Sequence, residues 1–195
     1  MALEIERRFL VSGDDWRRHV CSEARLQQGY LAVGADGLTV RVRCASGVAE
    51  VSGAWLTLKG RSPSPALELA GQVEQEGLVR QEFEYSIPAA DAAALLALAP
   101  HRLSKCRFEL DLPGGEWVLD VFDGDNAPLV VAEVELDVAS FQKGLEVELP
   151  IWCVRELTGQ HEFSNAALSR LPLAQWPEAQ RFDVVQALGS NTKKY

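Results

Sequence analysis

The chain has 195 residues, of which 47% are hydrophobic, and this composition suits a single globular domain with a core of ordinary size. Its 28 acidic and 19 basic residues give a net charge of −9, which disfavours nucleic acid as a partner because polyanions are repelled. No apolar run approaches the roughly 18 residues that a membrane span requires. No apolar leader precedes the first predicted strand, so we expect a cytoplasmic protein without a membrane partner. The four cysteines are far apart, which predicts neither a disulfide nor a zinc site.

The first predicted strand covers residues 3–11 and carries charge at alternate positions. Side chains alternate between the two faces of a strand, so Glu4, Glu6 and Arg8 share one face. Two carboxylates and a guanidinium on one face are costly against an apolar core. Their position therefore indicates either a solvated edge or a wet cavity.

The rest of the chain shows further strand patterns with helices before, between and after them. Counted with the first strand, there are eight strand candidates joined mostly by short turns, which favours a closed barrel or a strongly curved sheet. The further strands are predicted over residues 25–33, 38–43, 54–60, 78–87, 103–112, 116–122 and 129–137. Helices are predicted over residues 13–21 with Ser12 as N-cap, 89–99, 164–171 with Ser164 as N-cap, and 178–188.

We expect one domain over residues 1–188. Within it, residues 62–77 carry two Ser-Pro pairs and a Glu- and Gln-rich stretch, which indicate an insertion or flap loop rather than a linker between domains. Residues 172–188 are expected to form a helical appendage on the outside of the domain, and residues 189–195 a flexible tail.

Charged residues of the same sign recur two positions apart on the predicted strands. Like charges on one strand face repel mildly, so repeated pairs of this kind are an unusual decoration for a solvated sheet. If the faces converge inside a barrel, basic pairs can hold anionic oxygens, and carboxylate pairs can hold a divalent cation that bridges those oxygens. The pairs are Glu4/Glu6, Arg41/Arg43, Glu82/Glu84, Lys105/Arg107 and Glu133/Glu135, with Arg8, Lys59 and Arg80 as further basic residues at candidate interior positions.

Taken in order, these residues resemble the CYTH superfamily, the triphosphate tunnel metalloenzymes. The opening Glu4-Ile5-Glu6-Arg7-Arg8 is similar to the E-x-E-x-K opening of that family. The resemblance covers residues 3–170 and is closest to the compact bacterial branch. Further matches are Gln28-Gly29-Tyr30-Leu31, Arg41-x-Arg43, Leu56-Thr57-Leu58-Lys59, Arg80-Gln81-Glu82-Phe83-Glu84, Lys105-x-Arg107, Leu119-Asp120-Val121-Phe122, Glu133-Val134-Glu135, and a final motif at Trp152, Glu156, Thr158 and Phe163-Ser164-Asn165.

The resemblance implies an α+β fold, with an eight-stranded antiparallel closed β-barrel (a triphosphate tunnel) and peripheral helices. It also implies a hydrolase of triphosphate compounds, with inorganic tripolyphosphate as the expected substrate and Mg²⁺ or Mn²⁺ as the cofactor. No serine, cysteine or histidine nucleophile stands out, so we expect in-line attack by water. By position, the resemblance implies that Glu4, Glu6, Glu133 and Glu135 are catalytic metal ligands, with Glu82, Glu84 and Asp120 as further metal candidates. It implies that Arg8, Arg41, Arg43, Lys59, Lys105 and Arg107 bind the triphosphate.

Arg8 departs from the family pattern, which has lysine at this position. The charge is kept, but a planar fork replaces a compact ammonium, and this change is expected to affect substrate choice, metal geometry or hydrolysis. Class IV adenylyl cyclase and thiamine triphosphatase stay open as alternative activities. A non-catalytic module that binds polyphosphate or nucleotide is a third alternative, and a homodimer is left open.

Overall fold

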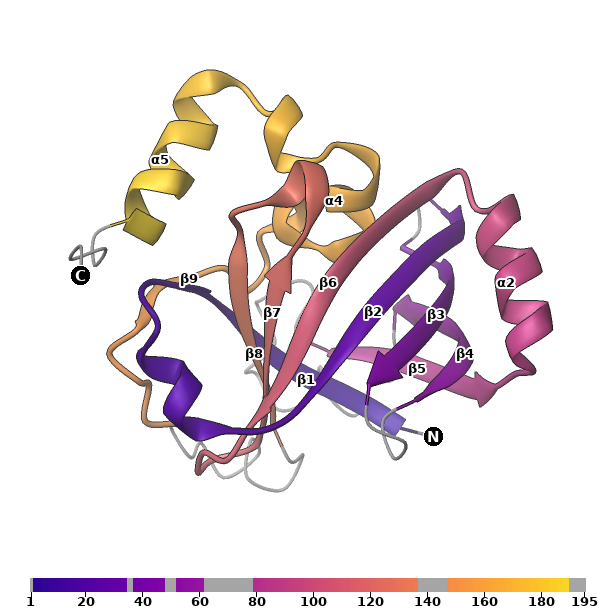
Figure 1. The fold of residues 1–195 in the computed structure, drawn as a ribbon, viewed down its shortest axis with the longest axis horizontal. Coiled ribbons are helices and arrows are strands. Elements are labelled where there is room, and N and C mark those ends of the chain that lie inside the picture. Colours follow the sequence, from indigo (N-terminus) through magenta and orange to yellow (C-terminus); the bar gives the residue numbers. More distant parts are fainter. Residues whose placement is uncertain (1, 35–36, 48–51, 62–78, 137–146, 190–195) are drawn as a thin grey trace.

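The computed structural model describes residues 2–34, 37–47, 52–61, 79–136 and 147–189, with the backbone alone at residues 2–5, 61, 79 and 80. The predicted insertion at 62–77 and the predicted tail beyond Gly189 lie outside the described residues. Within these ranges, a strongly curved sheet has helix α2 (Ala89–Leu98) beside one half and helices α4 (Asn165–Arg170) and α5 (Glu178–Gly189) at one end (Figure 1).

One antiparallel sheet of nine strands forms the body of the described structure. The strands follow the order β5-β4-β3-β2-β6-β7-β8-β1-β9, so most neighbours in the chain are also neighbours in the sheet. Their bounds are β1 Ala2–Val11, β2 Val20–Val33, β3 Thr39–Gly47, β4 Gly53–Arg61, β5 Val79–Ser86, β6 His101–Leu110, β7 Glu116–Phe122, β8 Val130–Glu135 and β9 Cys153–Glu156.

The expected eight-stranded closed barrel is wrong, because the sheet has nine strands and ends at β9. Strand β1 is shared among three partners: Ala2–Ile5 pair with β5, Glu6–Leu10 with β8, and Phe9–Val11 with β9. Strand β5 therefore reaches only the first part of β1, and β9 lies along the last part. The sequence did not predict β9 because its four residues are at the lower limit of a recognisable alternating pattern.

The two faces of the sheet are filled differently. Apolar side chains that include Phe9, Trp117 and Trp152 form a core cluster on the outer face. The inner face is apolar at one end, where Leu10 and Leu168 belong to a second core cluster, and charged further along the same strands. Two positions along each strand separate the apolar residue from the charged one, and the pairs are Leu10 and Arg8, Leu103 and Lys105, Phe122 and Asp120, and Val131 and Glu133.

Helix α2 confirms the helix predicted over residues 89–99. Its Ala- and Leu-rich sequence favours a helix, and Ala92 packs on Val42 and Ala54 of the sheet. Gly29 allows this close approach, since a Cβ added there would lie 2.7 Å from the Cβ of Ala99. The sheet face that carries α2 is the outer one, so the helix leaves the inner face accessible.

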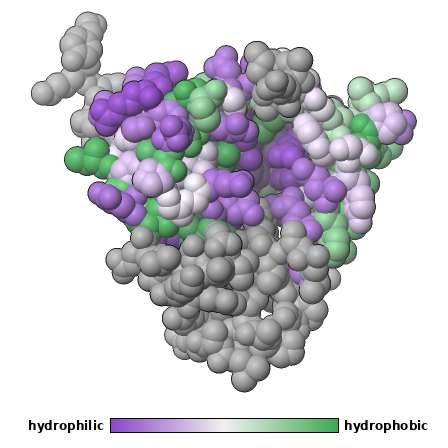
Figure 2. Space-filling view, turned by 90° about the horizontal axis from the view of Figure 1, so that it is seen from below, coloured by the Kyte–Doolittle hydropathy of each residue, from purple (hydrophilic) through white to green (hydrophobic). Residues whose placement is uncertain are grey.

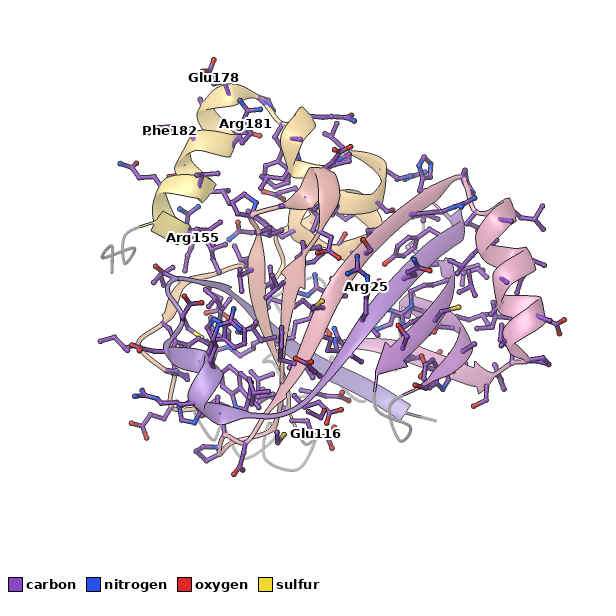
Figure 3. All side chains as sticks on the ribbon, viewed as in Figure 1. Arg25, Glu116, Arg155, Glu178, Arg181 and Phe182 are labelled. Carbon is purple, nitrogen blue, oxygen red and sulfur yellow. The ribbon has the colours of Figure 1, made fainter. Side chains whose placement is uncertain are left out.

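The helices near the C-terminal end of the described chain were largely predicted. Helix α4 has the predicted cap, because Ser164 Oγ accepts a hydrogen bond of 3.2 Å from the backbone N–H of Ala167. Helix α5 matches the helix predicted over residues 178–188, and Arg155 of β9 reaches it with Nη1 2.7 Å from Asp183 Oδ2 (Figure 3).

The helix predicted over residues 13–21 is only a short 3₁₀ helix over Asp15–His19. Its predicted cap is also wrong, because the Ser12 hydroxyl donates to the carbonyl of Leu188, at 3.1 Å. Among the described residues, no helix has the length and apolar character needed to cross a membrane.

Candidate functional site

Charged side chains from seven strands gather on the inner face of the sheet, and the space-filling view shows hydrophilic residues around a hollow in one face of the molecule (Figure 2). The alternation of each strand directs these side chains inward, while the curvature of the sheet brings them together. They form two groups. The Asp120 cluster consists of Glu6, Arg8, Lys105, Arg107, Asp120 and Glu133, and the Glu84 cluster consists of Arg41, Arg43, Thr57, Lys59, Glu82 and Glu84.

Asp120 is the buried centre of the first cluster, with 1% of its side chain exposed. Arg107 donates from Nε to Oδ1 at 2.8 Å and from Nη2 to Oδ2 at 2.7 Å. Lys105, whose side chain is fully buried, donates from Nζ to Oδ2 at 2.5 Å. Both oxygens of Asp120 therefore already accept hydrogen bonds from basic groups, which compete with a metal ion for this carboxylate.

Within the Asp120 cluster, opposite charges counteract the cost of burying Asp120, Lys105 and Arg107. Burial would raise the pKa of the Asp120 carboxyl, but Arg107 and Lys105 outweigh burial and hold this pKa well below its usual range. Burial lowers the pKa of Lys105 to about 8, and Asp120 opposes that shift. Burial also opposes the charge on Arg107, yet Asp120 and Glu133 raise its pKa above the ordinary value.

Glu133 and Arg8 connect this buried centre to the open part of the inner face. Glu133 Oε2 accepts from Nη2 of Arg107 at 2.9 Å, and its Oε1 lies 3.3 Å from Nε of Arg8. The Nη2 of Arg8 also contacts Oε1 of Glu6. One guanidinium thus bridges two carboxylates that come from neighbouring strands, β1 and β8.

The Glu84 cluster lies across the inner face on β3, β4 and β5. Arg43 Nη2 lies 2.7 Å from Glu84 Oε1, and Thr57 donates its hydroxyl to Glu84 Oε2 at 2.9 Å. Lys59 Nζ lies 2.9 Å from Glu82 Oε2. Arg41 Nη2 lies 3.5 Å from carboxylate oxygens of both glutamates and donates to Thr57 at 3.1 Å.

The two arginines of this cluster keep unused hydrogen-bond donors. Burial lowers the pKa of Arg43, with neighbouring Arg41 acting in the same direction. The buried Nε atoms of Arg41 and Arg43 have no hydrogen-bond acceptor in the described part of the chain. Buried donors are nearly always paired, so these atoms indicate a place for acceptor oxygens of a ligand.

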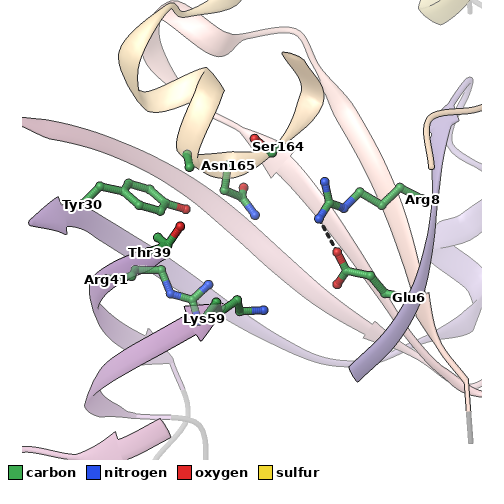
Figure 4. A pocket seen from close by; sticks show the side chains of 9 residues that line it. Glu6, Arg8, Tyr30, Thr39, Arg41, Lys59, Ser164 and Asn165 are labelled. Atoms are coloured by element: carbon green, nitrogen blue, oxygen red, sulfur yellow. Dashed lines mark hydrogen bonds and ion pairs between the residues drawn. The ribbon is translucent and has the colours of Figure 1, made fainter. Parts of the chain in front are cut away.

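A pocket opens between the two clusters (Figure 4). It encloses about 450 Å³ of space outside the atoms, part of which is open to solvent. Arg8 faces Arg41 and Lys59 across this space, and helix α4 closes one end. The lining residues are Glu6, Arg8, Tyr30, Thr39, Arg41, Lys59, Ser164, Asn165 and Ala166.

The structure brings together most of the predicted site residues and adds several that were not assigned to the site. Tyr30, Thr39, Ser164 and Asn165 line the pocket without having been predicted as site residues. Their signal was present in part, since Tyr30 and the Ser164-Asn165 pair lie in the motifs that resemble the family. The missing information was spatial, because a residue at the start of α4 shows no strand alternation.

Three predicted residues contribute less to the described site. Glu135 is exposed, although its Cα is paired with that of Glu6 in the β1–β8 register. Glu4 and Arg80 are paired across β1 and β5, but their side chains lie outside the described part of the structure. The role of Glu4 as a metal ligand and the interior position of the basic residue Arg80 therefore stay predictions.

The sequence and the fold are similar to those of known proteins. A family model described as the CYTH domain matches residues 2–168. The chain belongs to the CYTH domain family. An inorganic triphosphatase from Acetivibrio thermocellus is 32% identical over 182 residues, which cover 91% of this chain and 100% of that protein.

Among solved structures, the chain is similar to the crystal structure of the inorganic triphosphatase NE1496, with 29% identity and a TM-score of 0.55. This match covers 87% of the present chain and 95% of the other. A second crystal structure, of the hypothetical protein NE1496, matches with 30% identity and a TM-score of 0.54, covering 85% and 97% of the two chains. The ordered motifs of the sequence thus indicated the correct family.

The carboxylates of the site are suitable ligands for a divalent cation, but the described residues alone do not supply a complete set of ligands. Among the described side chains, no three Asp, Glu, His or Cys residues gather as a group that could hold a metal ion. Glu6 and Glu133 nevertheless converge on one cationic group, the guanidinium of Arg8. Magnesium often binds through one or two carboxylates together with substrate phosphates, so these two oxygen donors match its requirements.

Proposed function

We propose that this CYTH protein hydrolyses inorganic tripolyphosphate with the help of a divalent cation. The observation that carries the proposal is the pocket in which Arg8 faces Arg41 and Lys59, with a buried Nε–H on Arg41 that has no acceptor among the described residues. Guanidinium and ammonium groups are the strongest side-chain partners for phosphate oxygens. The inorganic triphosphatase relative supports the same chemistry.

The charges of the two clusters support dependence on a cation. The Asp120 cluster has three basic and three acidic side chains, and most of them are already paired. A triphosphate carries about four negative charges near neutral pH, because its last ionisation is close to the phosphate value of about 6. A cation that binds the carboxylates would release their basic partners for the phosphates.

Glu6 and Glu133 are the described residues that would hold this cation, with Glu4 and Glu135 as the further predicted ligands. When bound, a divalent cation supplies charge neutralisation and lowers the pKa of a water molecule. Arg8, Arg41 and Lys59 then orient the chain of phosphates so that its terminal phosphorus is held for in-line attack.

The pocket favours water as the nucleophile. No cysteine or histidine is among its described lining residues. Burial raises the pKa of Tyr30 to about 12, so its phenol stays protonated at neutral pH. Ser164 Oγ is already engaged as the cap of α4, at 3.2 Å from the N–H of Ala167. The hydroxyls of Ser164 and Thr39 have no histidine beside them among the described lining residues to act as a base, so direct hydrolysis agrees better with this lining than a covalent phosphoenzyme.

The lining also favours an inorganic substrate over a nucleotide or thiamine compound. Among the described lining residues, Tyr30 is the sole aromatic side chain, and it belongs to the apolar core cluster at the closed end. A nucleobase or thiazolium ring would therefore lack an open aromatic surface for stacking. The exposed part of the pocket instead presents charge.

Phosphate release from tripolyphosphate, ATP and thiamine triphosphate, each with Mg²⁺, with Mn²⁺ and with a chelator, tests this proposal. We expect tripolyphosphate to be the fastest substrate and the chelator to abolish turnover. Faster turnover of thiamine triphosphate would support a thiamine triphosphatase, and cyclic AMP with pyrophosphate from ATP would support a cyclase. Tight tripolyphosphate binding without turnover under either metal would support a binding module.

A further inference from the structure

Asn165 lies at the start of α4 and is part of the pocket wall. Its side-chain Oδ1 lies 3.0 Å from Nζ of Lys105, which is fully buried beneath it. This contact joins the helix to the Asp120 cluster, because the same ammonium donates to Asp120 at 2.5 Å. A buried charged group therefore contacts the side-chain amide of Asn165 directly.

The chemistry of Lys105 determines which way the Asn165 amide faces. An ammonium group donates hydrogen bonds and accepts none, so the amide must present its oxygen to Lys105. The amide nitrogen then points away from Lys105 and into the space beside Arg8 and Lys59, as Figure 4 shows. A reversed amide would place two donors against each other in a buried site, which is costly.

The Nδ2 of Asn165 has no acceptor among the described residues, whereas its Oδ1 is occupied. A donor that is held in one direction at the wall of a cationic pocket is suited to an oxygen of an anionic ligand. Unlike Arg8, Arg41 and Lys59, this donor has no carboxylate partner that must first be released.

We propose that Asn165 is a further substrate-binding residue, which donates from Nδ2 to a phosphate oxygen, and that Lys105 is a positioning residue that holds its amide in the donating direction. The inference rests on the proposed function, because it requires a polyphosphate in this pocket. It gives Lys105 a different role from the direct phosphate contact that the family resemblance implied, since its ammonium is fully buried and paired with Asp120 and Asn165.

Asn165→Asp separates the two roles of the side chain. The carboxylate keeps an acceptor for Lys105 and adds an ion pair, but it removes the donor and places a negative charge toward the ligand. We expect the Kd for tripolyphosphate, measured by calorimetry on the full chain without turnover, to rise at least about tenfold. The melting temperature should stay the same or rise. Gln175→Glu is the control, because this exposed residue adds the same charge outside the pocket and should leave Kd within about twofold.

A second measurement follows the amide itself. In ¹⁵N-labelled wild-type protein, the Nδ2 signal that is missing from Asn165→Asp should shift when tripolyphosphate is added. Wild-type protein that binds no tripolyphosphate would overturn the proposed function and this inference together. Wild-type binding with an unchanged Kd in Asn165→Asp, an equal loss in Gln175→Glu, or a stationary amide signal would overturn the inference alone.

Discussion

The guanidinium of Arg107 holds both carboxylate oxygens of Asp120, with Nε 2.8 Å from Oδ1 and Nη2 2.7 Å from Oδ2. The two residues face each other across β6 and β7, and Lys105 completes the arrangement from the same strand as Arg107. Bidentate pairs of this kind are strong because two charge-assisted hydrogen bonds fix one geometry. The pair lies in the buried part of the site, next to Glu133 and Arg8, which connect it to the more open part.

Asp120→Asn should destabilise the protein strongly, because Lys105 and Arg107 lose the negative charge of the buried carboxylate that they share. Removing one member of a buried ion pair costs about 3 to 5 kcal/mol, and urea unfolding would measure this loss. Asp183→Asn is the matched control. Asp183 Oδ2 lies 2.7 Å from Nη1 of Arg155, but 64% of the Asp183 side chain is exposed. The control should cost less than about 1 kcal/mol, and equal losses in the two variants would contradict the buried role of Asp120.

The same carboxyl predicts a loss of stability in acid. Its folded-state pKa lies below the ordinary value of 3.8, so the unfolded chain binds its proton first as the pH falls. The contribution of Asp120 is complete above that ordinary value and is lost as the pH falls from about 4 toward the folded pKa. Denaturant unfolding of wild type and Asp120→Asn across this window should show a smaller acid loss in the variant.

Lys105 gives the pH dependence of stability a slope of the same sign in alkali, in a different pH window. Burial lowers its pKa from 10.5 to about 8 in the folded protein, so the unfolded chain binds more protons between these values. The contribution of Lys105 to the unfolding free energy should therefore increase as the pH rises from about 8 to 10.5. A ¹³C-labelled lysine signal that titrates near pH 8 would support the shift. Titration of every lysine near 10.5 would contradict it.

Glu133→Gln should remove most hydrolysis while the fold is kept. The amide retains an acceptor for Arg107 but loses the charge that a divalent cation requires, so we expect turnover to fall roughly a hundredfold or more. Glu116→Gln is a control on the adjacent strand β7, where the side chain is exposed (Figure 3). Tripolyphosphate turnover at the wild-type rate in Glu133→Gln would contradict the metal assignment.

Arg8→Lys should strengthen cation binding. The planar guanidinium of Arg8 contacts Glu6 and Glu133 together, whereas a compact ammonium holds such a pair less well. A divalent cation that competes for these carboxylates should therefore bind several-fold more tightly in the variant. Titration with Mn²⁺ alone, followed by electron paramagnetic resonance, measures this affinity. Arg155→Lys should leave it unchanged, and weaker Mn²⁺ binding in Arg8→Lys would contradict the competition.

Alternation along the strands predicted which charged residues share a face of the sheet. Arg41, Lys59, Arg107 and Glu133 lie where period two places them, because one face of each strand must cover the apolar outer core. Alternation contains no information about partners across strands. Glu82 and Glu84 were predicted as metal candidates, and the registers of β3, β4 and β5 set them in ion pairs with Lys59 and Arg43.

The parts that sequence patterns missed depend on contacts between distant segments. Strand β9 is defined by hydrogen bonds to β1 rather than by its own four residues. Asn165 reaches the pocket because Leu168 and its apolar neighbours hold α4 at the closed end of the sheet. Local patterns could not predict either feature, since both arise from packing across more than a hundred residues of chain.

The sharing of β1 among three partners has a consequence for how the chain folds during synthesis. Its partners extend to Glu156 of β9, so β1 leaves the ribosome long before the strand that completes its pairing. An unpaired strand in that interval can join other nascent chains edge to edge, and charged side chains at alternate positions discourage such contacts. We therefore expect Glu6 and Arg8, which face the pocket in the finished protein, to disfavour such edge-to-edge contacts in the growing chain as well.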